Sequence, residues 1–148
     1  MIGLFQDTIE KVVALAVLMP IVASMGGIAG TQSLTVLIRA MAMGQINDRT
    51  EIWLVRREIL VSLINGLLWA AVIAFIASYW FSDVRLGLII AFAIVINLIT
   101  AGIAGASLPL LLDRLDIDPA LAGGVVLTTI TDVVGFFAFL GLAAYFYG

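Results

Sequence analysis

A single carboxylate, Asp132, stands in the otherwise uncharged run from Pro119 to Gly148. That run is long enough to cross a bilayer, and a carboxylate near mid-membrane costs about 2.5–3.5 kcal/mol on insertion scales. No lysine or arginine lies in the run to neutralise the acid locally. The pattern therefore favours a carboxylate that meets a passing cation over one that is held in a structural ion pair.

Small and polar residues accompany Asp132 at helical spacing. Gly124, Thr128, Asp132 and Gly135 are separated by four, four and three residues, which predicts one stripe along a helix. One chain offers only one such stripe, and two carboxylates that face one another in low dielectric repel unless a proton or cation lies between them. The stripe therefore favours a dimeric pore in which two copies of Asp132 share a divalent cation.

Composition indicates an integral membrane protein. The 148 residues are 64% hydrophobic and 11% charged, whereas soluble domains are about 45–50% apolar and 25% charged. The chain has no cysteine and no histidine, which excludes thiolate catalysis and the usual proton shuttle. Its net charge of −3, with no basic stretch, argues against nucleic acid as a partner. One intramembrane acid is a poor catalytic set, so we expect no enzymatic activity.

Four hydrophobic spans predict an all-α fold, because every backbone polar group must be satisfied inside the bilayer. We expect a single membrane domain over residues 1–148. Its four helices are predicted at about 8–43, 57–81, 86–112 and 119–147. The first would be about 54 Å long as one helix, against a hydrocarbon core of about 30 Å. Its small and polar stretch 26–33 is where we expect a break.

Basic residues are distributed unevenly between the two ends of these spans. Five arginines belong to one end: Arg39, Arg49, Arg56, Arg57 and Arg114. Only Lys11 and Arg85 belong to the other. The positive-inside rule then places the loops 44–56 and 113–118 in the cytoplasm and both termini outside.

Other polar residues have structural interpretations. Asp118 followed by Pro119 is typical of a helix N-cap. Acids at the inner ends of the spans, Glu58 among them, are expected to be solvated. Asn97 shares a helix face with Ala101 and Gly105, which favours an interhelical hydrogen bond, with pore lining as the alternative.

Three segments carry the motifs of one known family in the right order. Residues 20–39 contain Gly-Gly-Ile-Ala-Gly-Thr-Gln-Ser, which resembles the Gly-Gly-Asn-Ala-Gly-Thr-Gln-Ser signature of the MgtE magnesium channel family. Residues 56–66 resemble the start of that family's next membrane helix. Residues 116–135 are similar to its last helix, which carries the pore aspartate. The resemblance covers nearly the whole chain.

The resemblance implies a homodimer with the pore at the subunit interface and Asp132 as the metal-binding residue. From the stripe on the last span and the small and polar stretch of the first, we expect further residues to line the pore: Gly27, Gly30, Thr31, Gln32, Gly124, Thr128 and Gly135. The expected function is passive conduction of Mg²⁺ across the plasma membrane, with the ion largely hydrated because magnesium dehydrates reluctantly. The alternatives are a secondary Mg²⁺ transporter coupled to Na⁺ or H⁺ and a non-conducting membrane subunit. Selectivity among Mg²⁺, Mn²⁺, Co²⁺ and Ca²⁺ is left open, as is the gate.

The chain departs from the family pattern at three places. Ile28 replaces the usual asparagine, and Gly124-Val125 stands where Gly-Pro or Asn-Pro is common. These residues also match neither the family's first membrane helix nor its cytosolic Mg²⁺-sensing N and CBS domains. We therefore expect either a fragment or a shortened relative, and no cytosolic gating by Mg²⁺ within these residues.

Overall fold

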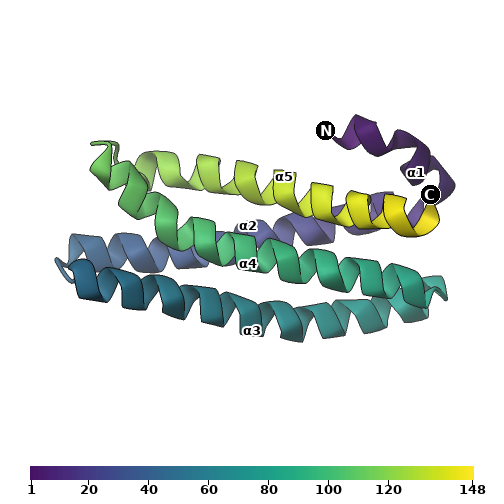
Figure 1. Cartoon of the computed structure of the whole chain (residues 1–148), viewed down its shortest axis with the longest axis horizontal. Coiled ribbons are helices and arrows are strands. Elements are labelled where there is room, and N and C mark those ends of the chain that lie inside the picture. Colours follow the sequence, from purple (N-terminus) through teal and green to yellow (C-terminus); the bar gives the residue numbers. More distant parts are fainter.

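The computed structural model describes all 148 residues, and it is helical with no strand. A short 3-10 helix, η1 (Ile2–Phe5), and the helix α1 (Gln6–Lys11) come first. Four long helices follow (Figure 1): α2 (Ala14–Ala42), α3 (Asp48–Phe81), α4 (Val84–Arg114) and α5 (Pro119–Tyr147). Each of the four is long and apolar enough to cross a membrane. The predicted all-α fold with four membrane helices is confirmed, and the chain is a multi-pass membrane protein.

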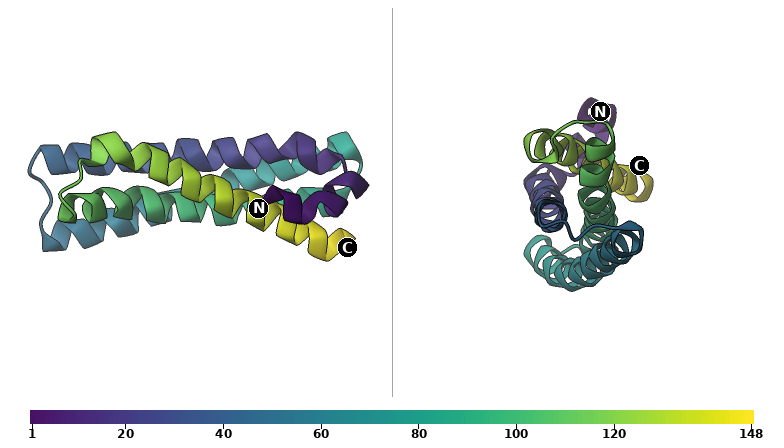
Figure 2. Two further views of the ribbon diagram at one scale, coloured as in Figure 1. Left: turned by 90° about the horizontal axis from the view of Figure 1, so that it is seen from above. Right: turned by 90° about the vertical axis from the view of Figure 1, so that its left-hand side faces the viewer.

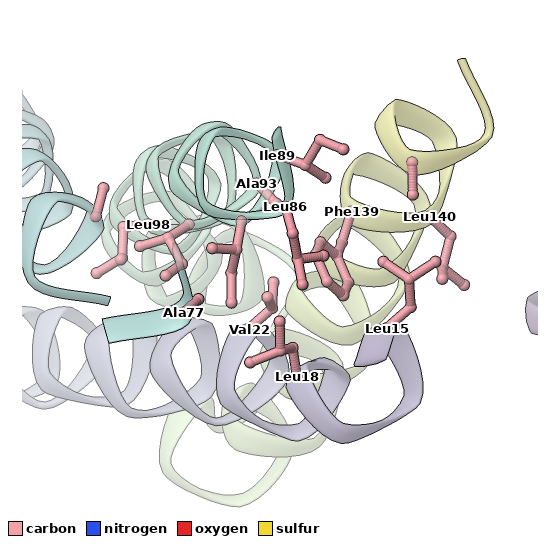
Figure 3. Close-up of a cluster of buried hydrophobic side chains, with 14 residues drawn as sticks. Leu15, Leu18, Val22, Ala77, Leu86, Ile89, Ala93, Leu98, Phe139 and Leu140 are labelled. Carbon is pink, nitrogen blue, oxygen red and sulfur yellow. The ribbon is translucent and has the colours of Figure 1, made fainter. Parts of the chain in front are cut away.

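The helix α4 lies at the centre of the bundle. It packs along α2, α3 and α5, while α2 and α3 touch each other little (Figure 2). The main apolar cluster joins side chains from all four long helices (Figure 3), among them Val22 of α2, Ala77 of α3, Ile89 of α4 and Phe139 of α5. Because the other three long helices all pack on α4, its side chains determine the positions of those helices.

Each of the last three helices has a side-chain cap at its N-terminus. Asn47 accepts hydrogen bonds from the first turn of α3, and Thr50 accepts one from the Asn47 backbone, which forms a capping box. The Asp83 side chain caps α4 by accepting hydrogen bonds from the Arg85 and Leu86 backbone N–H groups, without a reciprocal bond. Asp118 accepts from the Ala120 backbone at 2.9 Å, with Pro119 at the first helical position. The predicted N-cap of the last helix is confirmed.

The predicted break in the first span is wrong in position. Helix α2 runs without interruption through 26–33, and the chain bends instead at Val12, between α1 and α2. Gly26 and Gly30 are buried against side chains of other helices, so this stretch serves close packing. An apolar environment also leaves freed backbone groups no partner, which keeps the helix intact. Helix α3 likewise begins at Asp48, earlier than the predicted 57.

The two ends of the bundle differ in chemistry. The turns before α3 and before α5 lie at one end, where Arg114 contacts Glu51 at 2.9 Å. At the other end the N-terminal segment lies against the end of α5 (Figure 1), and Phe5 meets Phe137 edge to face. Tyr147 there donates a hydrogen bond to Asp83. The arginine-rich loops thus share one end, as the charge pattern predicts.

Candidate cation site between α2 and α5

A cleft of about 520 Å³ opens between α2 and α5. Most of the residues that line it are small or polar. Helix α2 contributes Ala23, Ser24, Gly27, Ile28, Thr31 and Gln32, and α5 contributes Thr128 and Asp132. Because α4 packs behind both helices, the cleft faces away from the centre of the bundle. The chain therefore has a polar hollow at its surface, on the side of α2 and α5 away from α4.

Asp132 has no partner within the chain. Its side chain is partly exposed in the cleft, and the single ion pair of the molecule joins Arg114 to Glu51, at the end of the bundle. No cluster of three or more acidic side chains surrounds it. A carboxylate that neither pairs with a cation nor caps a helix is free to meet a charge from outside the chain.

The threonines of the cleft present acceptor oxygens. The Thr31 hydroxyl donates to the Gly27 carbonyl at 2.8 Å, and the Thr128 hydroxyl donates to the Gly124 carbonyl at 2.9 Å. Since these protons are used within each helix, the hydroxyl oxygens keep lone pairs for other donors. A hydrated metal ion presents donor hydrogens on its bound waters. The carboxylate of Asp132 and these hydroxyls therefore match the outer surface of such an ion.

Two of the predicted pore-lining glycines, Gly30 and Gly135, are packed against side chains of other helices. A Cβ atom at Gly30 would be 2.9 Å from Leu127, and one at Gly135 would be 2.6 Å from the amide nitrogen of Asn97. Both glycines are buried, and neither lines the cleft of the single chain. On α5 the buried positions repeat every four residues: Gly123, Leu127, Thr131, Gly135, Phe139 and Ala143. Gly135, three residues after Asp132, therefore belongs to this buried stripe and not to the helix face that lines the cleft.

The other predicted site residues, apart from Gly124, line the cleft. Gly27, Thr31, Gln32 and Thr128 line it together with Asp132. Gly124 lies one turn before Thr128, outside the cleft, with open space where a Cβ would be.

The cleft also has a residue that the sequence analysis did not single out. Ser24 lies three residues before Gly27 and seven before Thr31 and so belongs to the same helix face. This spacing could have identified Ser24 from the sequence.

The family follows from comparison with known proteins. The family model of MgtE, described as a divalent cation transporter, matches residues 19–142. The chain belongs to the MgtE family. It is 35% identical over 145 residues to a protein of Bacillus subtilis named magnesium transporter MgtE, and the match covers 98% of this chain. Proteins with the same name from Thermus thermophilus and Enterococcus faecalis are 34% and 30% identical, over 94% and 99% of the chain.

This MgtE-family chain spans about a third of the length of those relatives, from 31% to 32%. The match nevertheless extends over nearly every residue of the chain. The cleft residues on α2 and α5 all fall within the matched range 19–142.

Glu58 occupies an unexpected position. The prediction that it is solvated is wrong, because it is only 7% exposed and accepts a hydrogen bond from the Ser33 hydroxyl at 2.8 Å. The early start of α3 places Glu58 within the helix, on a buried stripe that also repeats every four residues through Ser62 and Gly66. No basic side chain lies within ion-pair distance of it.

Asn97 forms the interhelical hydrogen bond that its sequence position predicts. Its Nδ2 group donates to the carbonyl oxygen of Val22 on α2 at 2.8 Å, and the residue is completely buried. It does not line the cleft. The choice between a helix contact and pore lining is thus decided for the helix contact.

Proposed function

We propose that this chain conducts Mg²⁺ passively across the plasma membrane, through a pore formed where two copies meet. The observation that carries the proposal is the unpartnered Asp132 carboxylate in a cleft of acceptor oxygens. The names of the relatives support Mg²⁺ as the substrate. The family description supports a divalent cation in general.

A second copy completes the site. The cleft is open on one side, and one chain supplies a single carboxylate. Two copies related by a two-fold axis along the membrane normal would present the same face to each other, since such an interface joins identical patches. Two Asp132 carboxylates would then face each other, and a divalent cation between them relieves their repulsion.

The ion passes largely hydrated. Magnesium keeps several of its waters at about 2.0–2.1 Å, so the Asp132 carboxylates hold it mainly through those waters. Thr31 and Thr128 accept hydrogen bonds from further waters of the same shell. A membrane potential that is negative inside supplies about 2.3 kcal/mol per charge per 100 mV, and roughly twice that for a divalent ion. No other energy source is needed.

The inward direction follows from the arginine-rich end of the bundle. The loops 44–56 and 113–118 face the cytoplasm in this proposal, and both termini face outward. The Arg114–Glu51 pair at 2.9 Å lies at that cytoplasmic end.

One observation favours a second candidate, Mg²⁺ transport coupled to H⁺. Glu58 is a buried acid with one hydroxyl donor and no basic partner, and acids inside membrane helices mark ion and proton pathways in pumps and transporters. Flux into liposomes with and without a pH gradient separates the two. Passive conduction predicts a flux that follows the Mg²⁺ gradient and the membrane potential alone.

The substitution Asp132→Asn tests the proposed function. We expect it to abolish or strongly reduce Mg²⁺ uptake into liposomes, because the hydrated ion then meets two neutral amides. The melting temperature of the protein in detergent without Mg²⁺ should stay the same or rise, since asparagine is cheaper than aspartate to bury in the membrane.

Asp116→Asn is the matched control, because Asp116 lies in the exposed turn before α5 and has a left-handed φ of 56° that asparagine tolerates. It should conduct like the unaltered protein. If Asp132→Asn conducts normally and melts at a lower temperature, Asp132 is a structural residue and the proposed function is wrong.

A further inference from the structure

Asn97 lies where α2, α4 and α5 meet. Its Nδ2 group donates to the Val22 carbonyl of α2 at 2.8 Å. Its Oδ1 atom is buried too, but it has no hydrogen-bond partner. The side chain thus connects α4 to α2 through one N–H group while its acceptor oxygen is unused.

Two glycines make room for this amide. A Cβ atom at Gly26 of α2 would overlap the amide nitrogen of Asn97, and one at Gly135 of α5 would lie 2.6 Å from it. Each glycine is close in sequence to a residue of the cleft, since Gly27 follows Gly26 and Asp132 precedes Gly135 by less than a turn. The amide therefore lies directly behind the segments of α2 and α5 that line the cleft.

Stability alone does not account for an asparagine at this position. A buried acceptor without a partner costs at least as much free energy as one neutral hydrogen bond returns. A leucine has nearly the same shape as asparagine and would leave no polar atom unsatisfied. Asn97 therefore adds little to the free energy of folding compared with an apolar residue. Its hydrogen bond does hold α4 at a fixed distance from α2.

We infer that Asn97 is a positioning residue, which sets the separation of α2 from α5 and so the width of the cleft at Asp132. An N–H group holds the Val22 oxygen at 2.8 Å, whereas a methyl group approaches a carbonyl oxygen only to about 3.3–3.6 Å. Loss of the amide would move α2 outward by roughly the difference, about 0.5–1 Å. The inference rests on the proposed function only where it concerns ions.

The separation itself can be measured without any ion flux. The chain has no cysteine, so Gly27→Cys combined with Thr128→Cys places one pair within each chain. Non-reducing electrophoresis scores this disulfide in the band of monomer mobility, apart from any Thr128→Cys disulfide between two copies. A Cβ at Gly27 would be 3.9 Å from the Cγ2 atom of Thr128, so the side chains at these two positions are in van der Waals contact. The rate of disulfide formation depends on the distance between the two Cβ atoms, which a disulfide holds about 3.5–4.5 Å apart. We expect Asn97→Leu in this background to slow disulfide formation by about threefold or more, because the two Cβ atoms move apart as α2 moves outward.

Thr100→Val in the same background is the matched control. Thr100 lies on the same helix, but its hydroxyl donates only to the Ile96 carbonyl of α4 itself, at 2.9 Å. Its loss should leave the disulfide rate unchanged.

Ion discrimination is the second readout, with the cysteine-free protein in liposomes. If Asn97 sets the width of the cleft, Asn97→Leu should change the ratio of Mg²⁺ to Ca²⁺ flux by about threefold or more, because the two hydrated ions differ in size. Thr100→Val should keep the ratio of the unaltered protein. A purely structural residue would lower both fluxes with the amount of folded protein and leave their ratio unchanged.

A second variant guards against failure of Asn97→Leu to fold. Asn97→Ala with Gly135→Ala removes the amide and places a methyl group in the vacated space, and it should change both readouts in the same direction. An unchanged disulfide rate in a folded variant overturns the inference, and so does a slower rate with an unchanged flux ratio. If the unaltered protein passes no Mg²⁺, the proposed function fails, and the positioning role is then decided by the disulfide rate alone.

Discussion

Ile28 lies at the edge of two hollows in the surface of the molecule. It lines the cleft with Asp132, and it also lines an apolar groove of about 400 Å³ between α2 and α3. It is the bulkiest apolar side chain of the cleft and stands where the family motif has asparagine. At this position a polar side chain would add hydrogen-bonding groups to the cleft, along the ion path that we propose, and isoleucine adds none.

Ile28→Asn is therefore expected to raise Mg²⁺ flux into liposomes by about threefold or more at unchanged expression, since it adds hydrogen bonds to the waters around the ion. Val17→Asn is the matched control, because Val17 is on the same helix and equally exposed, at 61%, but outside the cleft. Equal flux in Ile28→Asn and the unaltered protein would mean that position 28 does not face the path.

The candidate site could be predicted from the sequence to the extent that it follows helical spacing. Asp132 and Thr128 were identifiable as polar residues four apart in an apolar run. Glu58 was not, because its burial depends on where α3 begins and on which helix covers that face. The burial of Gly135 was not predictable for a related reason, since only the contact with Asn97 shows which stripe of α5 is buried.

At the scale of the helices, glycines decide how closely two backbones approach. A Cβ atom at Gly105 of α4 would lie 2.6 Å from the Gly30 carbonyl oxygen of α2. A backbone atom cannot move aside as the end of a side chain can. Small residues at such contacts allow the close packing that holds membrane helices together.

Gly105→Ala should therefore destabilise the protein by about 1–3 kcal/mol, the usual effect of overpacking. Gly141→Ala on α5 is the control, because a Cβ there has no neighbour within 4 Å. The measurement is thermal unfolding in detergent. Equal melting temperatures for the two variants would show that α2 and α4 are not in close backbone contact at Gly105.

A hydrogen bond links the turn between α3 and α4 to the end of α5. The Tyr147 hydroxyl donates to Asp83, and this bond is the main reason that the pKa of Asp83 lies below its usual value. Since the pKa is lowered in the folded state, the interaction stabilises the fold above the unfolded pKa of about 3.9. The stabilisation is lost as the pH falls through the lower, folded pKa.

Tyr147→Phe should lower stability at neutral pH by about 1 kcal/mol, the usual contribution of one hydrogen bond. The difference from the unaltered protein should shrink in acid, as the pH falls below about 4. Tyr145→Phe is the control, since Tyr145 is exposed and its hydroxyl has no partner in the fold. A difference that persists undiminished in acid would show that Asp83 is not the acceptor.

The number and order of the long helices were predictable because apolar runs of this length have no other stable form in a bilayer. The bend in the first span was not. Gly26 and Gly30 suggest flexibility in the sequence alone, but the neighbours that press against them make the same stretch a rigid contact. The distinction depends on partners from α4 and α5, which are distant in the sequence.

At the scale of the whole molecule, the open side of the cleft is where a second copy is expected. Val125 is 71% exposed next to this face, whereas Leu127 is completely buried on the other side of α5. The two positions are close in sequence but differ in whether another chain can reach them.

Val125→Cys should therefore form a disulfide between two copies in membranes, and Thr128→Cys should do the same. Leu127→Cys and Val134→Cys are the controls and should form no disulfide between copies. Non-reducing electrophoresis measures the result without interference, because the chain has no cysteine of its own. Crosslinking from Leu127 or Val134 alone would place the dimer contact on another face.

The buried polar contacts have a consequence for how the ribosome delivers this chain to the membrane. Glu58 bonds to Ser33, and Asn97 bonds to Val22, so each polar side chain finds its partner on a helix that was synthesised before it. Helices that enter one after another can therefore be satisfied as they arrive. Asp132 is synthesised after all of these residues and finds no such partner. The free-energy cost of placing its carboxylate in the membrane is therefore not offset by any contact within the four helices.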